Sequence, residues 1–171
     1  MWPWGHAALG YLSYRLFSGE ASVEPSRLEL GVLLVGTQFP DLVDKPLAWY
    51  WTVLPTGRSF AHSVLTLAAF CVLAYGVARR FDRPRLALAA AVGYASHLVG
   101  DALSPVVHGE FSFLTFLAWP LLPSPEYPTE KSFLAHFQNL EPTGGVLFGL
   151  ALSLVALAAF VTTEYGHRWR D

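Results

Sequence analysis

Residues 86–105, LALAAAVGYASHLVGDALSP, are apolar over about the 20 residues that a helix needs to cross a membrane. Two polar side chains, His97 and Asp101, interrupt this stretch one helical turn apart. Ionisable groups are costly in hydrocarbon, so their presence inside a span usually indicates a function. The stretch therefore predicts a transmembrane helix that carries a polar site on one face.

The composition of the whole chain agrees with a membrane protein. Its 171 residues are 53% hydrophobic and 14% charged, with a mean hydropathy of +0.39. Residues 60–78 and 143–163 are apolar enough for two further full spans. Residues 4–17 and 28–40 are shorter and predict tilted, partly submerged or re-entrant helices. We expect an all-α polytopic membrane bundle of about five helices, three of them full spans, in one domain over residues 1–171.

The arginines predict the orientation of this bundle. Four lie in the short connection 79–85, and two more follow the last span. Basic connections favour the cytoplasmic side, so the opposite helix ends are expected to face outward. His6, Asp41, His62 and Asp101 all belong to such outward ends. The sequence thus predicts a multi-pass protein of the cell membrane with a polar site on its extracytoplasmic side.

These outward residues have the chemistry of a metal site. His97 and Asp101 share one helix face because of their i, i+4 spacing. Imidazole and carboxylate ligands together suit a divalent ion, most readily Zn²⁺, with Mn²⁺ or Fe²⁺ as alternatives. The same pair could instead form a hydrogen bond that only fixes helix packing.

Four motifs in this order carry a resemblance to a known family: WGHAALGYL, QFPDLVDKP, GRSFAHSVL and GYASHLVGDALSP. Over about residues 5–105 they resemble the YdjM-type, LexA-regulated inner-membrane metal-dependent hydrolases. The order His, Asp, His and His-x3-Asp is also similar to the zinc phospholipase C and single-strand nuclease superfamily, whose helical domains cluster metal ions to hydrolyse phosphoesters. The resemblance implies a hydrolase.

The resemblance also implies which residues hold metal. The first ion would be held by Asp41, His62, His97 and Asp101. His6 would help to hold a second ion, with Asp101 bridging, and one to three ions are expected in all.

The pattern also points to residues near the motifs whose roles it leaves open. His108 and His136 stand close to places where the phospholipase-like pattern has further ligands. Glu141 follows His136 by five positions, which misses the one-turn spacing of that pattern. Asp44 is a ligand, a partner of a ligand or a surface acid.

Catalytic roles are expected for Asp41, Asp101 and Arg58. A bound divalent ion lowers the pKa of its water towards ~7 and stabilises the negative charge that develops on phosphoryl oxygens. Phosphoester hydrolysis requires both effects. Arg58 is suited to a bidentate grip on phosphate or, alternatively, to anchoring its helix at headgroup level. Lys45 and Lys131 are less directional candidates. A site at membrane depth favours a lipid or lipid-linked substrate.

The remaining features concern access and partners. Residues 105–142 are rich in proline and are expected to form an outer cap or a re-entrant hairpin. Gly145-x3-Gly149 permits close helix contact, within the chain or in a homo-oligomer. No nucleic-acid partner is expected, because the arginines lie away from the site.

Two functions of other classes stay open. The first is a non-enzymatic scaffold or partner-binding protein, stabilised by a structural metal or by the buried His/Asp cluster. The second is ion or proton transport, against which the mostly apolar stretch 64–78 argues.

Overall fold

The computed structural model describes residues 1–18, 25–126, 132, 134, 138, 141 and 143–168, with side chains up to Thr163. The regular structure of these residues is entirely helical. Its elements are α1 (Pro3–Phe17), α2 (Arg27–Trp49), α3 (Val64–Arg80), α4 (Pro84–His108), the 3-10 helix η1 (Phe111–Ala118) and α6 (Gly144–Arg168). The predicted all-α fold is confirmed for this part of the chain.

Two helices, α4 and α6, are long and apolar enough to cross a membrane. About half of α4 is buried in the structure, whereas most of α6 is exposed. The span predicted at 60–78 is shorter than expected, because Ser63 caps α3: its Oγ accepts a hydrogen bond from the backbone N of Thr66 at 3.1 Å. Three full spans therefore stay a prediction.

Helix α2 is longer than the predicted 28–40 stretch. It begins at a capping box, in which Ser26 Oγ accepts from the backbone N of Glu29 at 3.2 Å and Glu29 Oε2 accepts from the backbone N of Ser26 at 3.0 Å. It then continues through Pro40 and Pro46 to Trp49. This extension decides the site, because residues 41–45 lie on a helix instead of in a loop.

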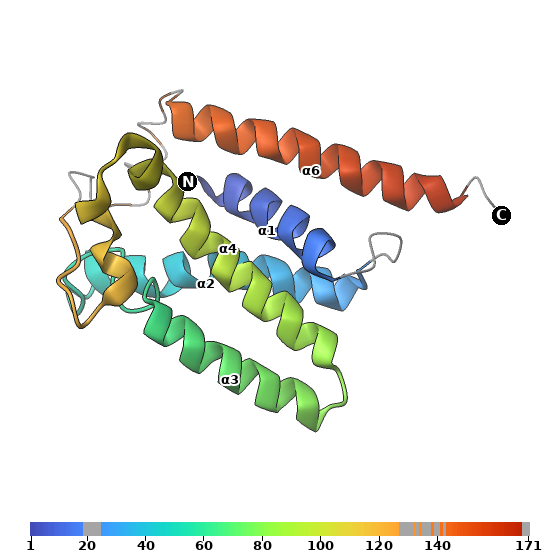
Figure 1. Cartoon of the computed structure of the whole chain (residues 1–171), viewed down its shortest axis with the longest axis horizontal. Helices are drawn as coiled ribbons and strands as arrows, with labels where there is room; N and C mark the ends of the chain where they lie inside the picture. Colours follow the sequence, from blue (N-terminus) through green and yellow to red (C-terminus); the bar gives the residue numbers. More distant parts are fainter. Residues whose placement is uncertain are drawn as a thin grey trace.

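The helices run in alternating directions, so chemically similar ends gather together (Figure 1). The start of α1, the end of α2, the start of α3 and the end of α4 lie at the same end as η1. The basic ends lie opposite, where Arg85 Nε is 3.7 Å from Glu29 Oε1 and Arg15 donates to Thr163 Oγ1 at 3.1 Å. The convergence of distant helix ends expected from the sequence is present.

Glycines bring α2 and α4 into backbone contact. A Cβ at Gly93 would lie 2.5 Å from the carbonyl oxygen of Leu33, and one at Gly36 would lie 2.9 Å from that of Ala90. Helix α1 approaches as closely, since a Cβ at Gly10 would lie 2.3 Å from Thr37 Cγ2. Small residues at helix crossings are typical of membrane bundles. These crossings set the distance between the polar residues of α2 and α4.

The region predicted as a proline-rich cap divides into several parts. Its first residues, Pro105 to His108, belong to α4, and η1 follows and packs against α3 and α4. Residues 127–131 and most of those up to 142 lie outside the described residues. The cap itself thus stays a prediction.

Candidate metal centre

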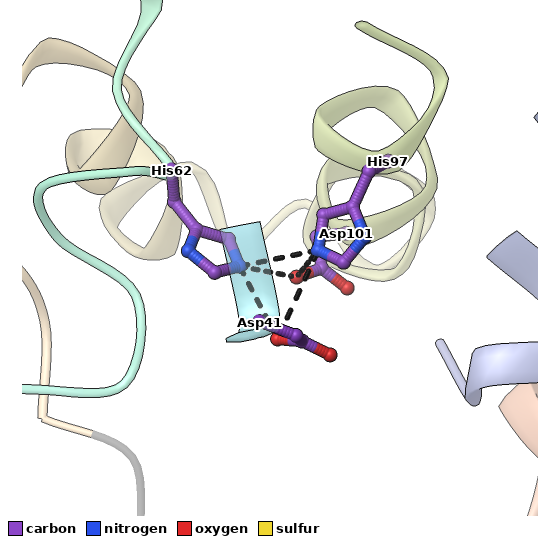
Figure 2. Close-up of side chains that lie close together, drawn as sticks. All are labelled: Asp41, His62, His97 and Asp101. Atoms are coloured by element: carbon purple, nitrogen blue, oxygen red, sulfur yellow. Dashed lines mark hydrogen bonds and ion pairs between the residues drawn. The ribbon is translucent and has the colours of Figure 1, made fainter. Parts of the chain in front are cut away.

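Four buried side chains from three separate segments converge at the end of the bundle near η1 (Figure 2). Asp41 comes from α2, His62 from the connection before α3, and His97 and Asp101 from α4. One ligand atom from each lies within 4.8 Å of those of the other three. These are the four residues that the sequence resemblance implies for the first metal ion.

The separations between these atoms suit one tetrahedral ion. His62 Nε2 lies 3.2 Å from His97 Nε2 and 3.5 Å from both Asp41 Oδ1 and Asp101 Oδ2. His97 Nε2 lies 3.8 and 3.7 Å from the same two oxygens. Four ligands at the usual Zn–N and Zn–O distances are about 3.3–3.6 Å apart from each other. The donor set therefore fits a divalent metal in both chemistry and size.

The Nδ1 atom of each of the two histidines in the cluster already donates a hydrogen bond. His97 Nδ1 donates to the carbonyl oxygen of Thr37 at 2.6 Å, and His62 Nδ1 donates to Asp44 Oδ2 at 2.8 Å. A neutral imidazole that donates from Nδ1 presents a lone pair at Nε2. The two Nε2 atoms consequently face each other, an arrangement that needs a proton or a cation between them.

Asp44 binds the His62 ring and the backbone of the segment that carries His62. Besides the ring of His62, its carboxylate accepts hydrogen bonds from the backbone N of Ser59 and Ala61, both at 2.8 Å, and of His62 at 3.2 Å. The Tyr94 hydroxyl donates to the carbonyl oxygen of Ala61 and so holds the same segment. Asp44 is fully buried, and its position matches that of a partner of a ligand rather than of a ligand or a surface acid.

His62 carries an unusual proton affinity. Its burial lowers its pKa, but its hydrogen bonds to Asp101, Asp41 and Asp44 outweigh burial and raise the pKa of His62 to about 10. A metal ion must therefore displace a proton from this imidazole at neutral pH.

His6 lies beside this cluster rather than within it. Its ring stacks on His97 with centroids 3.9 Å apart, and its Nε2 lies 3.3 Å from Asp101 Oδ1. The ring is fully buried, and neither nitrogen has hydrogen-bond geometry with any described residue. Gly100 makes room for it, since a Cβ there would lie 3.0 Å from His6 Nδ1. The two oxygens of Asp101 thus face different histidines, as a bridging carboxylate would.

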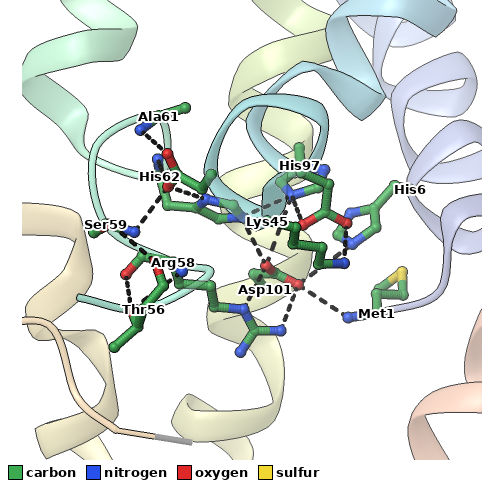
Figure 3. Close-up of polar contacts among 12 residues, drawn as sticks. Met1, His6, Lys45, Thr56, Arg58, Ser59, Ala61, His62, His97 and Asp101 are labelled. Carbon is green, nitrogen blue, oxygen red and sulfur yellow. Dashed lines mark hydrogen bonds and ion pairs between the residues drawn. The ribbon is translucent and has the colours of Figure 1, made fainter. Parts of the chain in front are cut away.

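Cations pair with the two carboxylates of the cluster (Figure 3). Arg58 Nε lies 2.9 Å from Asp101 Oδ2, and Lys45 Nζ lies 2.6 Å from Asp41 Oδ2. The α-amino group of Met1 lies 2.9 Å from Asp101 Oδ1. Arg58 is therefore in the predicted place but binds a carboxylate.

Two other predicted candidates, His108 and Glu141, lie outside the cluster. His108 is exposed at the end of α4, instead of in a loop, and its Nδ1 donates to the carbonyl oxygen of Ser104 at 2.8 Å. Glu141 is exposed. His136 and Lys131 lie outside the described residues.

Comparison with known proteins supports the resemblance given by the motifs. The YdjM inner membrane protein family matches residues 1–167, which include every residue of the cluster. No curated protein and no solved structure shows significant similarity to the chain. The likeness to the zinc phospholipase C superfamily stays a hypothesis. Because the match covers nearly the whole sequence, the chain belongs to the YdjM inner membrane protein family.

Proposed function

We propose that this protein is a membrane-bound metal-dependent hydrolase that cleaves phosphoester bonds of a lipid or lipid-linked substrate at the extracytoplasmic face. The observation that carries the proposal is the pair of histidine Nε2 atoms 3.2 Å apart, flanked by two carboxylates and fixed from behind. Such preorganised ligands are typical of metal sites, in which outer hydrogen bonds orient the imidazoles.

The residues would share the work of hydrolysis. A bound divalent ion lowers the pKa of water and polarises a phosphoryl oxygen. His62 and His97 would hold the ion, and Asp101 would reach both this position and His6. A carboxylate oxygen of Asp41 or Asp101 that does not hold the ion accepts the proton of the attacking water. Arg58 bears a planar, bidentate donor group suited to phosphate.

The surroundings of the site favour a substrate that reaches it from the membrane surface. The connection that carries His62 begins with Tyr50 and Trp51, which are 63% and 66% exposed. Exposed tyrosine and tryptophan at one end of a membrane bundle are typical of the interface between lipid and water. A lipid headgroup at this level would meet the site directly.

A test compares matched variants of the full chain in detergent. His97→Ala and Asp101→Asn should lose bound metal and turnover of bis-p-nitrophenyl phosphate together. His108→Ala is the control, because it removes an exposed histidine from the same helix and should retain both. Turnover that survives complete removal of metal, or that is unchanged in Asp101→Asn, would contradict the proposal.

A scaffold function is the second candidate, and the ion pairs favour it. Lys45–Asp41 and Arg58–Asp101 can neutralise both carboxylates without a metal. The cluster would then only fix the crossing of α2 and α4. In that case a chelator should leave the thermal unfolding midpoint unchanged, whereas a metal centre predicts a lower midpoint.

A further inference from the structure

Each carboxylate of the metal centre is paired with a cation that reaches it from the surface. Lys45 Nζ lies 2.6 Å from Asp41 Oδ2, and Arg58 binds Asp101 through Nε at 2.9 Å and Nη2 at 3.1 Å. The side chains of Lys45 and Arg58 are 19% and 26% exposed, whereas that of Asp101 is 2% exposed. The two cations therefore form the solvent-facing side of the cluster (Figure 3).

The two cations are also neighbours on a fixed support. A Cβ at Gly57 would lie 3.3 Å from Lys45 Cγ, so the segment that carries Arg58 packs on the Lys45 stem. Thr56 Oγ1 accepts from the backbone N of Arg58 at 3.2 Å, and Ser124 Oγ donates to its carbonyl oxygen. Because the backbone is held, movement of the guanidinium is limited to the Arg58 side chain.

A divalent ion would change the charge balance of this cluster. The cluster contains three buried carboxylates, those of Asp41, Asp44 and Asp101. Lys45 pairs with Asp41, and Arg58 and the α-amino group of Met1 pair with Asp101. The ion would add net positive charge even after it displaces a proton from His62. Its ligand atoms would be Asp101 Oδ2, which Arg58 now contacts, and Asp41 Oδ1, next to the Oδ2 that Lys45 contacts. Like charges a few ångströms apart in a poorly screened site repel each other. The metal-bound centre consequently has excess positive charge that an anion can neutralise.

We propose that Lys45 and Arg58 form an anion clamp that metal binding releases for the phosphate group of the substrate. Asp41 and Asp101 would hold the ion, whose charge would weaken both ion pairs, and the ammonium group of Lys45 and the guanidinium group of Arg58 would then bind phosphoryl oxygens. This inference rests on the proposed function, because it assumes that these carboxylates hold metal. It predicts linkage: metal and phosphate must raise each other's affinity by the same factor.

Calorimetry of the full chain in detergent tests the linkage, with Mn²⁺ as the metal and inorganic phosphate as the anion. Phosphate should bind the Mn²⁺-loaded protein at least about tenfold more tightly than the chelator-treated protein. Mn²⁺ should bind more tightly by the same factor when phosphate is present. Equal phosphate affinity with and without Mn²⁺ would overturn the clamp.

Variants separate a clamp from a purely structural ion pair. Lys45→Gln and Arg58→Gln should each weaken phosphate binding to the loaded protein by about tenfold, yet leave Mn²⁺ affinity unchanged or increased, because a competitor for the carboxylate is gone. A structural pair predicts that both affinities fall. Arg80→Gln, in the last turn of α3, is the matched control and should change neither.

Arg58→Lys keeps the charge but not the bidentate geometry, so it should fold even where Arg58→Gln does not. It should weaken phosphate binding without weakening Mn²⁺ binding, and a loss of Mn²⁺ binding would overturn the clamp. A failure of the proposed function can be distinguished from a failure of the anion clamp. No Mn²⁺ binding by the unmodified chain contradicts the proposed function, whereas Mn²⁺ binding without phosphate linkage contradicts the clamp alone.

Discussion

Asp44 holds His62 at two points with a single oxygen. Its Oδ2 accepts hydrogen bonds from the ring Nδ1 at 2.8 Å and from the backbone N at 3.2 Å. The other oxygen, Oδ1, accepts from the backbone N of Ala61. One carboxylate of α2 therefore determines both the position of the segment before α3 and the direction of the His62 ring.

This relationship predicts a strong effect from a residue that does not touch the metal. Asp44→Asn keeps the shape but places an NH₂ group where a carboxylate oxygen accepts backbone donors. Loss of such a supporting group typically lowers metal affinity by about 10–100-fold. Mn²⁺ titration against a competing chelator measures the change. Asp82→Asn is the control, because Asp82 lies in the α3–α4 turn at φ 58, a conformation that asparagine tolerates. Unchanged affinity in Asp44→Asn would contradict this role.

The glycine contact between α2 and α4 gives a second prediction. Gly93→Ala would push a methyl group into the Leu33 carbonyl, 2.5 Å from the new Cβ, and should destabilise the protein by about 1–3 kcal/mol. It should also weaken metal binding, because Thr37 and Asp41 of α2 would move away from His97. Gly76→Ala is the control: no atom lies within 4 Å of its Cβ, so the change should stabilise α3 by up to about 1 kcal/mol. Thermal unfolding in detergent with and without Mn²⁺ distinguishes the two, and equal midpoints would contradict the argument.

Periodicity and charge predicted which helix ends converge, and the family resemblance implied the four residues that lie together there. His97 and Asp101 share a helix face by spacing alone, and the basic connections identify which helix ends meet. The predicted end of α2, at residue 40, was wrong. It was placed there because an internal proline usually terminates a helix. In the structure, packing against α4 outweighs the hydrogen bonds lost at Pro40 and Pro46. The Lys45–Asp41 pair follows from this extension and therefore had no clear sequence signal.

Other parts of the site depend on tertiary contacts that no pattern encodes. The partner of His97 is the backbone carbonyl of Thr37, and every residue has a carbonyl. Tyr94 looks in sequence like any aromatic residue of a span, although its hydroxyl holds the segment of His62. His108 follows the motif at a plausible distance, but α4 continues past Pro105 and carries it outside the cluster.

The pKa of His62 predicts how metal binding depends on pH. His62 lies before α3, outside the two helices that can span a membrane, and its pKa is raised to about 10. Because a metal ion must displace this proton, metal affinity should rise by up to about tenfold per pH unit at pH values below about 10, where His62 holds the proton. Stability of the metal-free protein has the opposite sign: the contribution of His62 is complete below pH ~6.5 and is lost as the pH rises towards about 10.

Chelator-competition titrations between about pH 6 and about pH 8.5 measure this slope. His108→Ala should keep it, because that histidine is exposed and lies outside the cluster. Affinity that does not change with pH would show that no proton is displaced from the site.

The position of His6 predicts the number of ions. Its Nε2 lies 3.3 Å from Asp101 Oδ1 without hydrogen-bond geometry, whereas Asp101 Oδ2 faces His62 and His97. We expect the unmodified chain to bind a second ion at His6, and His6→Ala to lose that ion while it retains the first. Metal analysis after gel filtration gives the stoichiometry. An identical metal content in both proteins would remove His6 from the site.

Orientation in the membrane decides which substrates can reach the site, and it can be tested independently of metal. Val53, in the connection that leads to His62, is 69% exposed, and Phe81, at the opposite end of α3, is 70% exposed. In a Cys71→Ser background, Val53→Cys should react with a membrane-impermeant maleimide in intact cells. Phe81→Cys, beside the arginines, should react only after permeabilisation. The reverse pattern would place the candidate metal centre in the cytoplasm and would contradict the proposed cleavage of a substrate at the extracytoplasmic face.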